Sequence, residues 1–107
     1  MAIFYFDNSG RVIAFRRQPD DKFLFDERGH WIGWFPWGDD DAVNREGAYL
    51  GTTVGNRFLA RVSPRYRGYP GYPGYPGYAG YPGYPGYAGY AGYHPGFKDV
   101  DSSRLKG

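Results

Sequence analysis

A three-residue repeat between residues 66 and 93 limits what the rest of the chain can fold into. Ten tyrosines stand three positions apart there, and eight of them are followed by Pro or Ala and then Gly. Proline fills the position after tyrosine five times and alanine three times. Such a segment offers no large aliphatic side chain for a core. About 64 residues of the 107 are therefore left for a folded head, which is marginal on its own because a domain of this size buries only ~60% of its surface.

We predict that residues 65–97 form a disordered tail with a polyproline II bias. Glycine at every third position raises the entropy cost of ordering the chain. A polyproline II helix has three residues per turn, so the tyrosines would share one edge with their rings ~9 Å apart. Rings at that spacing do not stack on one another and stay available for weak, additive contacts. The tyrosines concerned are Tyr66, Tyr69, Tyr72, Tyr75, Tyr78, Tyr81, Tyr84, Tyr87, Tyr90 and Tyr93.

Other interpretations of the tail are less favoured. Collagen also has glycine at every third position, but here the repeat is short and proline is sparse. A plain spacer would not need ten tyrosines. A ligand for proline-binding domains would carry PxxP or adjacent prolines, which this tail lacks.

The first 64 residues contain a less obvious repeat, centred on a turn. An Asp or Asn stands three positions before a glycine three times, at intervals of 19 and 18 residues. Such a side chain starts a tight turn, and glycine supplies the positive φ that closes it. The flanking runs are aromatic and β-branched, which predicts strands and therefore β-hairpins. The turn residues are Asp7, Gly10, Asp26, Gly29, Asn44 and Gly47, with Gly55 and Asn56 turning a fourth hairpin.

These hairpins predict an all-β domain over residues 1–64. No window has the 3.6-residue apolar period of a helix, and hairpins in series usually remove their open edges by closing on themselves. We expect a small, shallow, pseudo-symmetric barrel of about four β-hairpins. The head has aromatic residues of its own, so it should need none from the tail. Residues 98–107 form a short polar C-terminus, either a docking segment or a frayed end.

Two stretches of the head carry a resemblance to a known family. The first is Gly-His-Trp-Ile-Gly-Trp-Phe at residues 29–35, and the second is Tyr-Leu-Gly-Thr at residues 49–52. Together they make residues 3–62 resemble the four-fold β-flower family, a group of small bacterial domains. The resemblance implies hairpin petals around a shallow barrel and no established activity. The likeness of such barrels to tubby-like and scramblase-like barrels points weakly to membrane lipids.

Composition and charge exclude several classes of protein. The head carries eight basic and nine acidic residues, and the rest of the chain five and two, for a net charge of +2. This lacks the clustered basic stripe of a nucleic-acid binder, so no nucleic-acid partner is expected. Cysteine is absent, which rules out disulfides. No signal peptide or membrane-spanning run is evident. We expect a cytoplasmic protein that is either free or peripheral to the membrane.

A ligand site is predicted at His30, Trp31, Trp34 and Trp37. Histidine titrates near neutral pH and could serve as a ligand or a base, although it also follows a turn glycine and could be only a polar post-turn residue. With a strand period of two, Trp31, Gly33, Phe35 and Trp37 should share one face and Ile32 and Trp34 the other. The tryptophans cannot all enter one small core, so at least one should lie at a rim.

No catalytic or metal site is evident. Asp7 and Asp26 occupy the same place in the repeat, which makes them turn initiators rather than paired catalytic carboxylates. The run from Asp39 to Asp41 does not have the spacing of a calcium loop and is interpreted as a solvated turn. No nucleophile–base pair, phosphate loop or dinucleotide motif occurs. We expect no enzyme activity, no cofactor and no metal.

The sequence therefore predicts a non-enzymatic interaction or scaffold protein. Its tail would drive weak multivalent association with itself, with a protein partner or with a membrane surface. The alternative is a module that binds a small molecule or lipid headgroup at the aromatic mouth of the head.

Overall fold

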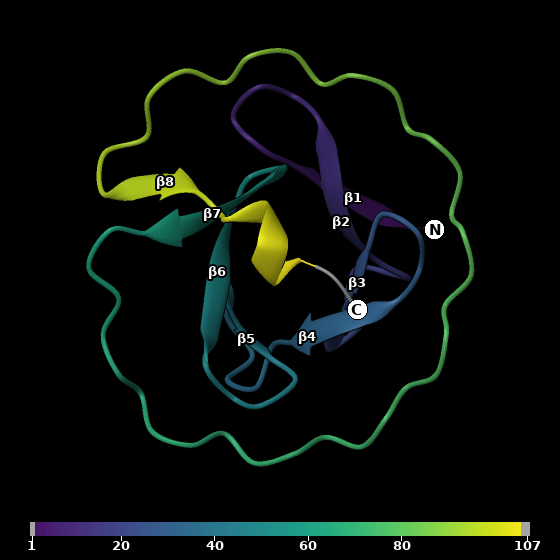
Figure 1. Ribbon diagram of the computed structural model, residues 1–107, viewed down its shortest axis with the longest axis vertical. Coiled ribbons are helices and arrows are strands. Elements are labelled where there is room, and N and C mark those ends of the chain that lie inside the picture. The colour runs from purple at the N-terminus through teal and green to yellow at the C-terminus, as the bar shows by residue number, and fades with distance from the viewer. Residues whose placement is uncertain (1, 106–107) are drawn as a thin grey trace.

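The computed structural model describes residues 2–105, which contain eight strands and no α-helix. The prediction of an all-β fold is therefore confirmed for this part of the chain (Figure 1). The strands are β1 (Ile3–Phe6), β2 (Val12–Arg16), β3 (Phe23–Asp26), β4 (Trp31–Trp34), β5 (Asp41–Asn44), β6 (Tyr49–Val54), β7 (Arg57–Arg61) and β8 (Phe97–Asp99). One short 3₁₀ helix, η1 (Ser102–Arg104), follows β8.

The first seven strands form a closed barrel. Each pairs antiparallel with the next along the chain, and β1 meets β7 in parallel where Phe6 faces Arg57. The backbone N–H of Phe6 also donates to the carbonyl of Asn56 at 2.9 Å. Closure leaves no full strand edge open, which is how a small sheet avoids pairing with other chains. The strand β8 adds to the far end of β7, where Arg61 faces Phe97.

The same kind of turn connects the two strands in each of the first three hairpins. In the second hairpin, Oδ1 of Asp26 accepts from the N–H groups of Arg28 and His30, both at 2.9 Å. Oδ1 of Asn44 accepts from the N–H groups two and four residues on in the same way. In the first hairpin, Oδ1 of Asp7 accepts from the N–H four residues on and from the Ser9 hydroxyl. The glycine three residues after each of them has φ between 93° and 99°, a conformation that favours glycine.

A β-bulge follows each of these turns and changes which residues face the core. The register of all three hairpins shifts by one residue, so that Ile13, Ile32 and Leu50 have no direct partner on the opposite strand. A bulge puts two residues opposite one and breaks strict alternation. In the second hairpin, Ile32 and Phe35 consequently both pack in the barrel core, while Trp31 belongs to a separate cluster. The predicted grouping of Trp31 with Phe35 is therefore wrong.

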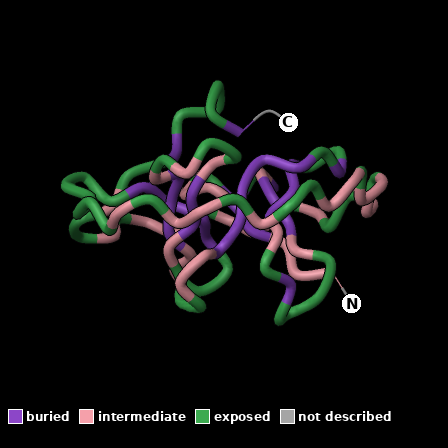
Figure 2. The backbone as a smooth tube through the Cα atoms, turned by 90° about the horizontal axis from the view of Figure 1, so that it is seen from below, coloured by how far each residue is buried: buried purple, intermediate pink, exposed green. Residues whose placement is uncertain are grey.

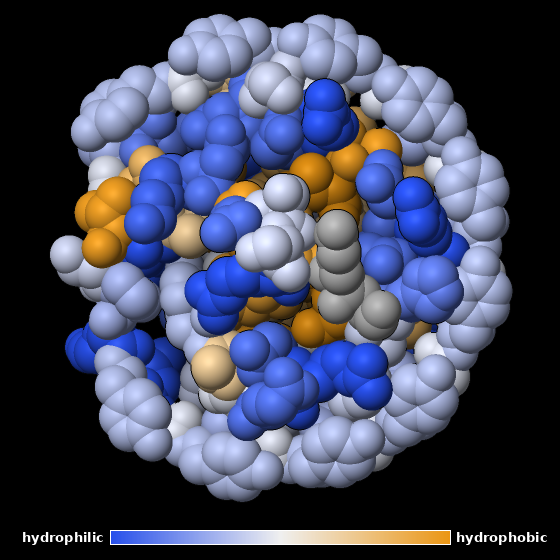
Figure 3. Space-filling view, in the orientation of Figure 1, coloured by the Kyte–Doolittle hydropathy of each residue, from blue (hydrophilic) through white to orange (hydrophobic). Residues whose placement is uncertain are grey.

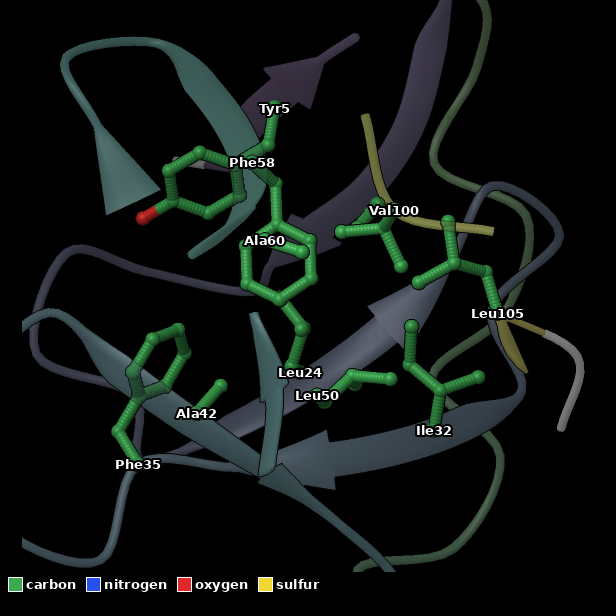
Figure 4. Packing of buried hydrophobic residues seen from close by; sticks show 11 residues of the cluster. Tyr5, Leu24, Ile32, Phe35, Ala42, Leu50, Phe58, Ala60, Val100 and Leu105 are labelled. Carbon is green, nitrogen blue, oxygen red and sulfur yellow. The ribbon is translucent and has the colours of Figure 1, made fainter. Parts of the chain in front are cut away.

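The barrel core is narrow and needs small residues at fixed places. Its buried members include Leu24, Leu50 and Phe58 (Figure 4). A Cβ on Gly51 would lie 2.7 Å from the ring of Phe58, closer than carbon atoms can pack. Gly33 and Ala14 hold the corresponding place in the other repeats, and Ala14 is fully buried. The Gly or Ala that ends each repeat is thus a packing requirement.

The C-terminal segment completes this core. Val100 and Leu105 are buried in the same cluster as the barrel residues (Figure 4). Asp101 is the N-cap of η1, and its carboxylate accepts a hydrogen bond from the N–H of Ser103 at 3.1 Å. Residues 97–105 are therefore packed on the barrel.

The tail encircles the barrel. Residues 65–96 run around the rim as a single loop (Figure 1), and the loop closes where the N–H of Val62 donates to the carbonyl of Gly96 at 2.9 Å. The prediction of polyproline II is wrong, because the glycines from 68 to 92 all have φ between +81° and +95° and polyproline II needs about −75°. The prediction of disorder is also overturned, because the segment is docked on the head.

Truncation of the core should destabilise the protein strongly. We expect Leu24→Ala to lower the free energy of unfolding by about 2–5 kcal/mol, because Leu24 is fully buried and a cavity remains. Val62→Ala is the matched control: its side chain is exposed, and the change should stay within about 0.5 kcal/mol. Urea denaturation followed by circular dichroism measures both. A Leu24→Ala loss as small as that of the control would contradict this core.

Candidate functional site: the tyrosine girdle

The tail docks on the carbonyls of the hairpin turns. The N–H of Ala79 donates to the carbonyl of Gly29, and the N–H of Ala88 donates to that of Gly10, both at 2.9 Å. The N–H of Ala91 donates to the carbonyl of Asn8 at 2.8 Å. Each acceptor belongs to one of the hairpin turns that begin with Asp or Asn and have Gly three residues later, which we call Asx-Gly turns. The turns that build the head therefore also hold the tail.

The turn glycines are needed for a second reason, the close approach of the tail. A Cβ on Gly29 would overlap the backbone of Gly80, and one on Gly10 would overlap that of Gly89. At Gly47 a Cβ would lie 3.1 Å from the ring of Tyr69 and 3.2 Å from Cδ of Pro70. These glycines therefore combine a positive φ with a surface on which another backbone can lie.

Side chains of the tail cover the outer aromatic cluster of the head. This cluster contains Phe15, Phe25 and Trp31, and Ala79 packs against it. The ring of Trp31 lies 5.9 Å from that of Tyr72 and 5.7 Å from that of Tyr75. The sequence predicts that the head needs no aromatics from the tail, and this is wrong at Trp31.

Two further contacts hold the tail near the second and first turns. The hydroxyl of Tyr78 donates to the carbonyl of Arg28 at 2.9 Å, and its ring lies 5.0 Å from that of His30. The guanidinium of Arg57 donates to the carbonyls of Asp7 and Gly89, both at 2.9 Å. Arg57 is a buried residue of β7. Its two hydrogen bonds therefore link the barrel wall to the tail.

A charged clasp fixes the start of the tail. The guanidinium of Arg67 binds the carboxylates of Asp39 at 2.8 Å and Asp41 at 2.9 Å and lies 4.1 Å from the centre of the Trp37 ring. Burial acts to raise the pKa of Asp39, but the N–H of Asp41 and the Arg67 guanidinium outweigh it and hold that pKa below 3.8. The acidic run interpreted as a solvated turn therefore binds the tail. Among residues 2–105, no group of three His, Asp or Glu side chains could hold a metal ion.

The ten tyrosines of the tail form a girdle around the molecule. Their exposed fractions run from 59% to 87%, although the docked backbone is partly covered. The molecule is flattened, with extents of 35 × 33 × 24 Å, and Figure 2 shows it edge-on. In the space-filling view the tyrosine rings line its rim (Figure 3). We call these ten residues, Tyr66 to Tyr93, the tyrosine girdle.

The structure does not bring the predicted ligand residues together. Trp31 is buried under the tail, Trp37 is half-buried beneath Arg67, and Trp34 is buried with no partner for its Nε1 among the described residues. Only His30 lines a cavity, one of about 400 Å³ near the C-terminal segment. Its other lining residues are Asp7, Arg11, Val12, Ile13, Asp26, Glu27, Arg28, Val100, Ser102 and Leu105.

Three of the polar side chains that line this cavity have partners within the hairpin turns. Nδ1 of His30 lies 3.6 Å from a carboxylate oxygen of Asp26, whose other oxygen accepts from two turn N–H groups. Asp7 is held by its own turn in the same way. The site is thus a polar rim with an apolar floor from Val12, Val100 and Leu105, and not an aromatic mouth.

Comparison of the chain with protein-family models, curated proteins and solved structures found no match. Within residues 2–105, no helix has the length and apolar character needed to cross a membrane. The function must therefore be argued from the geometry of the head and the girdle.

The clasp makes a prediction about pH. A carboxylate whose pKa is lowered by folding stabilises the folded state above its unfolded pKa, and that contribution is lost as the pH falls through the folded value. We expect Arg67→Ala to lower the thermal midpoint at pH 7. The gap between wild type and variant should close as the pH falls from the ordinary pKa of an aspartate through the lowered pKa of Asp39 in the folded protein.

The control is Arg65→Ala, because Arg65 is exposed and has no ion pair among the described residues. Its thermal midpoint should match that of the wild type at pH 7 and also at pH 2. A gap for Arg67→Ala that persists unchanged at pH 2 would show that the clasp acts through packing on Trp37 and not through charge.

Proposed function

We propose that this chain is a non-enzymatic interaction protein whose tyrosine girdle makes weak, multivalent contacts. The observation that carries this proposal is the outward display of all ten tyrosines by a tail that is itself docked. Side chains kept for the fold alone would turn inward. Here three backbone N–H groups of the tail donate to the head, and every one of the ten tyrosines stays more than half exposed.

The size of the exposed aromatic surface supports the proposal. A tyrosine has about 200 Å² of surface. With exposed fractions of 59% to 87%, the ten tyrosines of the girdle leave roughly 1,400 Å² accessible at the rim. A specific interface uses about 800 Å² per partner, and monomeric proteins rarely expose an apolar patch beyond a few hundred Å². A girdle of this area has room for more than one partner at a time, which is the requirement for multivalent binding.

Docking of the tail on the head also favours binding of a partner, because it lowers the chain entropy that is lost when the partner binds the tyrosines. A free glycine-rich tail would lose chain entropy whenever its tyrosines were held by a partner. With the tail already fixed at three carbonyls of the head, much of that cost is met during folding. The rings are thus preorganised, as in other surfaces where tyrosine supplies contact area at low entropy cost.

The contacts open to the girdle are of three kinds. Tyrosine rings pack on other aromatic rings, including those of a second copy. They accept cations such as arginine on their faces, and they settle at membrane interfaces. We propose self-association, a protein partner or a membrane surface in this order, since a net charge of +2 repels second copies only weakly. We also propose that the head belongs with the four-fold β-flower domains, which its repeated hairpins around a closed barrel support.

The girdle can be tested without disturbing the docking contacts. Tyr81, Tyr84, Tyr90 and Tyr93 make no ring contact or hydrogen bond with the head among the described residues. We expect their joint replacement by Ser to weaken concentration-dependent association, or binding to liposomes, at least tenfold, because each ring contributes about 0.5–1.5 kcal/mol to a contact. Sedimentation velocity and liposome co-sedimentation measure the two.

Replacement of the same four residues by Phe is the matched control, since it keeps the rings and removes only the hydroxyls. That variant should associate as the wild type does or more strongly. If the Ser variant and the wild type associate equally, the girdle is not the binding surface.

A second candidate function rests on the cavity beside His30. Its volume of about 400 Å³ and its mixture of apolar floor and charged rim suit a small polar molecule or a lipid headgroup. In this candidate, Arg11 and Arg28 would bind an anionic group of the ligand. The girdle would then serve only to hold the head together.

The cavity makes its own prediction. A ligand that fills it should shift the amide resonances of Val12, His30 and Val100 together in heteronuclear NMR spectra, and His30→Ala with Arg28→Ala should weaken that ligand roughly tenfold or more. Gln18→Ala, at an exposed position outside the cavity, is the control. No shift at these residues across a panel of phosphates, nucleotides and headgroups would remove this candidate.

A further inference from the structure

The positions of alanine in the tail coincide with its docking bonds. Of the eight residues that follow a tyrosine between 70 and 91, five are proline and three are alanine. The three alanines are Ala79, Ala88 and Ala91, and their N–H groups are the three that donate to the turns of the head. Proline has no N–H to donate. The repeat therefore changes from proline to alanine where a donor is used.

This pattern also specifies one register. Ala79 and Ala88 are nine residues apart, and Pro70, nine residues before Ala79, lies at the third turn beside Gly47. A uniform Gly-Tyr-X repeat could slip by one triplet without changing its chemistry. With the present sequence, a slip in one direction brings Pro76 and Pro85 to the acceptors of Ala79 and Ala88. A slip in the other direction brings Pro82 to the acceptor of Ala79, so either slip loses hydrogen bonds.

The binding surface on the head is a track made of turn carbonyls. We define the docking track as the carbonyls of Asn8, Gly10 and Gly29 with the glycine surfaces beside them. It recognises an extended chain with small residues and N–H donors at fixed spacing. Nothing in this recognition requires that the chain be covalently joined to the same head.

The C-terminal arm, residues 65–105, is one continuous segment that follows the barrel strands and packs on them. It carries the tail, β8 and the buried Val100 and Leu105, and it joins the end of β7 through residues 62–64, which are all exposed. Ala79 lies 18 positions after Arg61, a stretch that can extend to roughly 60 Å. The whole molecule is only 35 Å across. The arm can therefore reach the docking track of a neighbour.

We propose that the docking track is an interaction surface for the C-terminal arm of a second copy, which replaces the chain's own arm by exchange. The same hydrogen bonds and buried contacts form in either case, so exchange changes little except the number of chains involved. Exchange of an identical element between two copies is a low-cost route to a dimer, and the segment around Pro64 that would act as the hinge is exposed. Exchange is independent of the girdle, which stays exposed in both arrangements.

Cross-linking of full-length chains tests this proposal, because the chain has no cysteine of its own. Arg28 is exposed, and its carbonyl binds the tail residue next to Ala79. Chains with Arg28→Cys are mixed at high concentration with chains carrying Ala79→Cys, which keeps the N–H donor, and then treated with a short bis-maleimide. We expect covalent heterodimers. A single chain with both substitutions should give a cross-linked monomer, which shows that the two sites are adjacent.

Two controls separate exchange from collision and from a different register. Asp20→Cys, exposed and away from the tail contacts, replaces Arg28→Cys and should give no heterodimer with Ala79→Cys. Ala88→Pro with Ala91→Pro in the Ala79→Cys chain should lower the heterodimer yield roughly tenfold or more, since two docking bonds are lost. Pro82→Ala with Pro85→Ala should leave the yield within about twofold, since these positions face no acceptor of the track.

The proposal is overturned if the doubly substituted chain cross-links internally while the mixture gives no heterodimer. It is also overturned if the alanine-to-proline variant forms heterodimers as readily as its control. The Tyr-to-Ser girdle variant should exchange normally, so failure of the girdle as a binding surface and failure of exchange give different results.

Discussion

The Asx-Gly turn is the constraint on which the rest of this structure depends. Its side-chain oxygen binds N–H groups ahead of it, and its glycine takes a φ near +95°, so each turn fixes the register of the hairpin it ends. A bulge then follows in all three hairpins and directs one aliphatic residue, such as Ile32, inward. Repetition of this unit curves the sheet until Phe6 meets Arg57 and the barrel closes.

The same turns also solve a problem of size. A barrel of about 60 residues has little core, and here its outer aromatic cluster at Trp31 and one end of its interior are covered only by residues beyond the barrel. Val100 and Leu105 enter the core, while Tyr72 and Tyr75 pack on Trp31. Since the turn carbonyls hold the segment between these contacts, the head and the tail form one cooperative fold rather than a domain with an appendage.

The sequence predicted the barrel because its turns have a local chemistry that repeats: Asp26 and Gly29 act within four residues of each other. Two features could not be predicted in this way. Strict alternation failed at Trp31 because a bulge is a property of two paired strands and leaves no mark in one of them. The docked tail was missed because composition alone predicts disorder, whereas the informative signal was the place of three residues, Ala79 among them, within the proline pattern. The predicted cluster of His30 with the tryptophans assumed that sequence neighbours share a site.

The order of the tail can be explained without burial of its tyrosines. Glycine increases the freedom of an undocked chain, but proline at every third position over most of the repeat restricts it. The entropy lost on docking is correspondingly smaller, and a few anchors suffice: three N–H donors, the Arg67 clasp and the Trp31 contact. A tail with alanine at every such position would have more N–H donors. Its undocked chain would, however, have more conformational freedom to lose, and it could dock in more than one register. A tail with proline at every one would be stiff but have nothing to donate. The mixed pattern meets both requirements, and for that reason the tyrosines can remain outside.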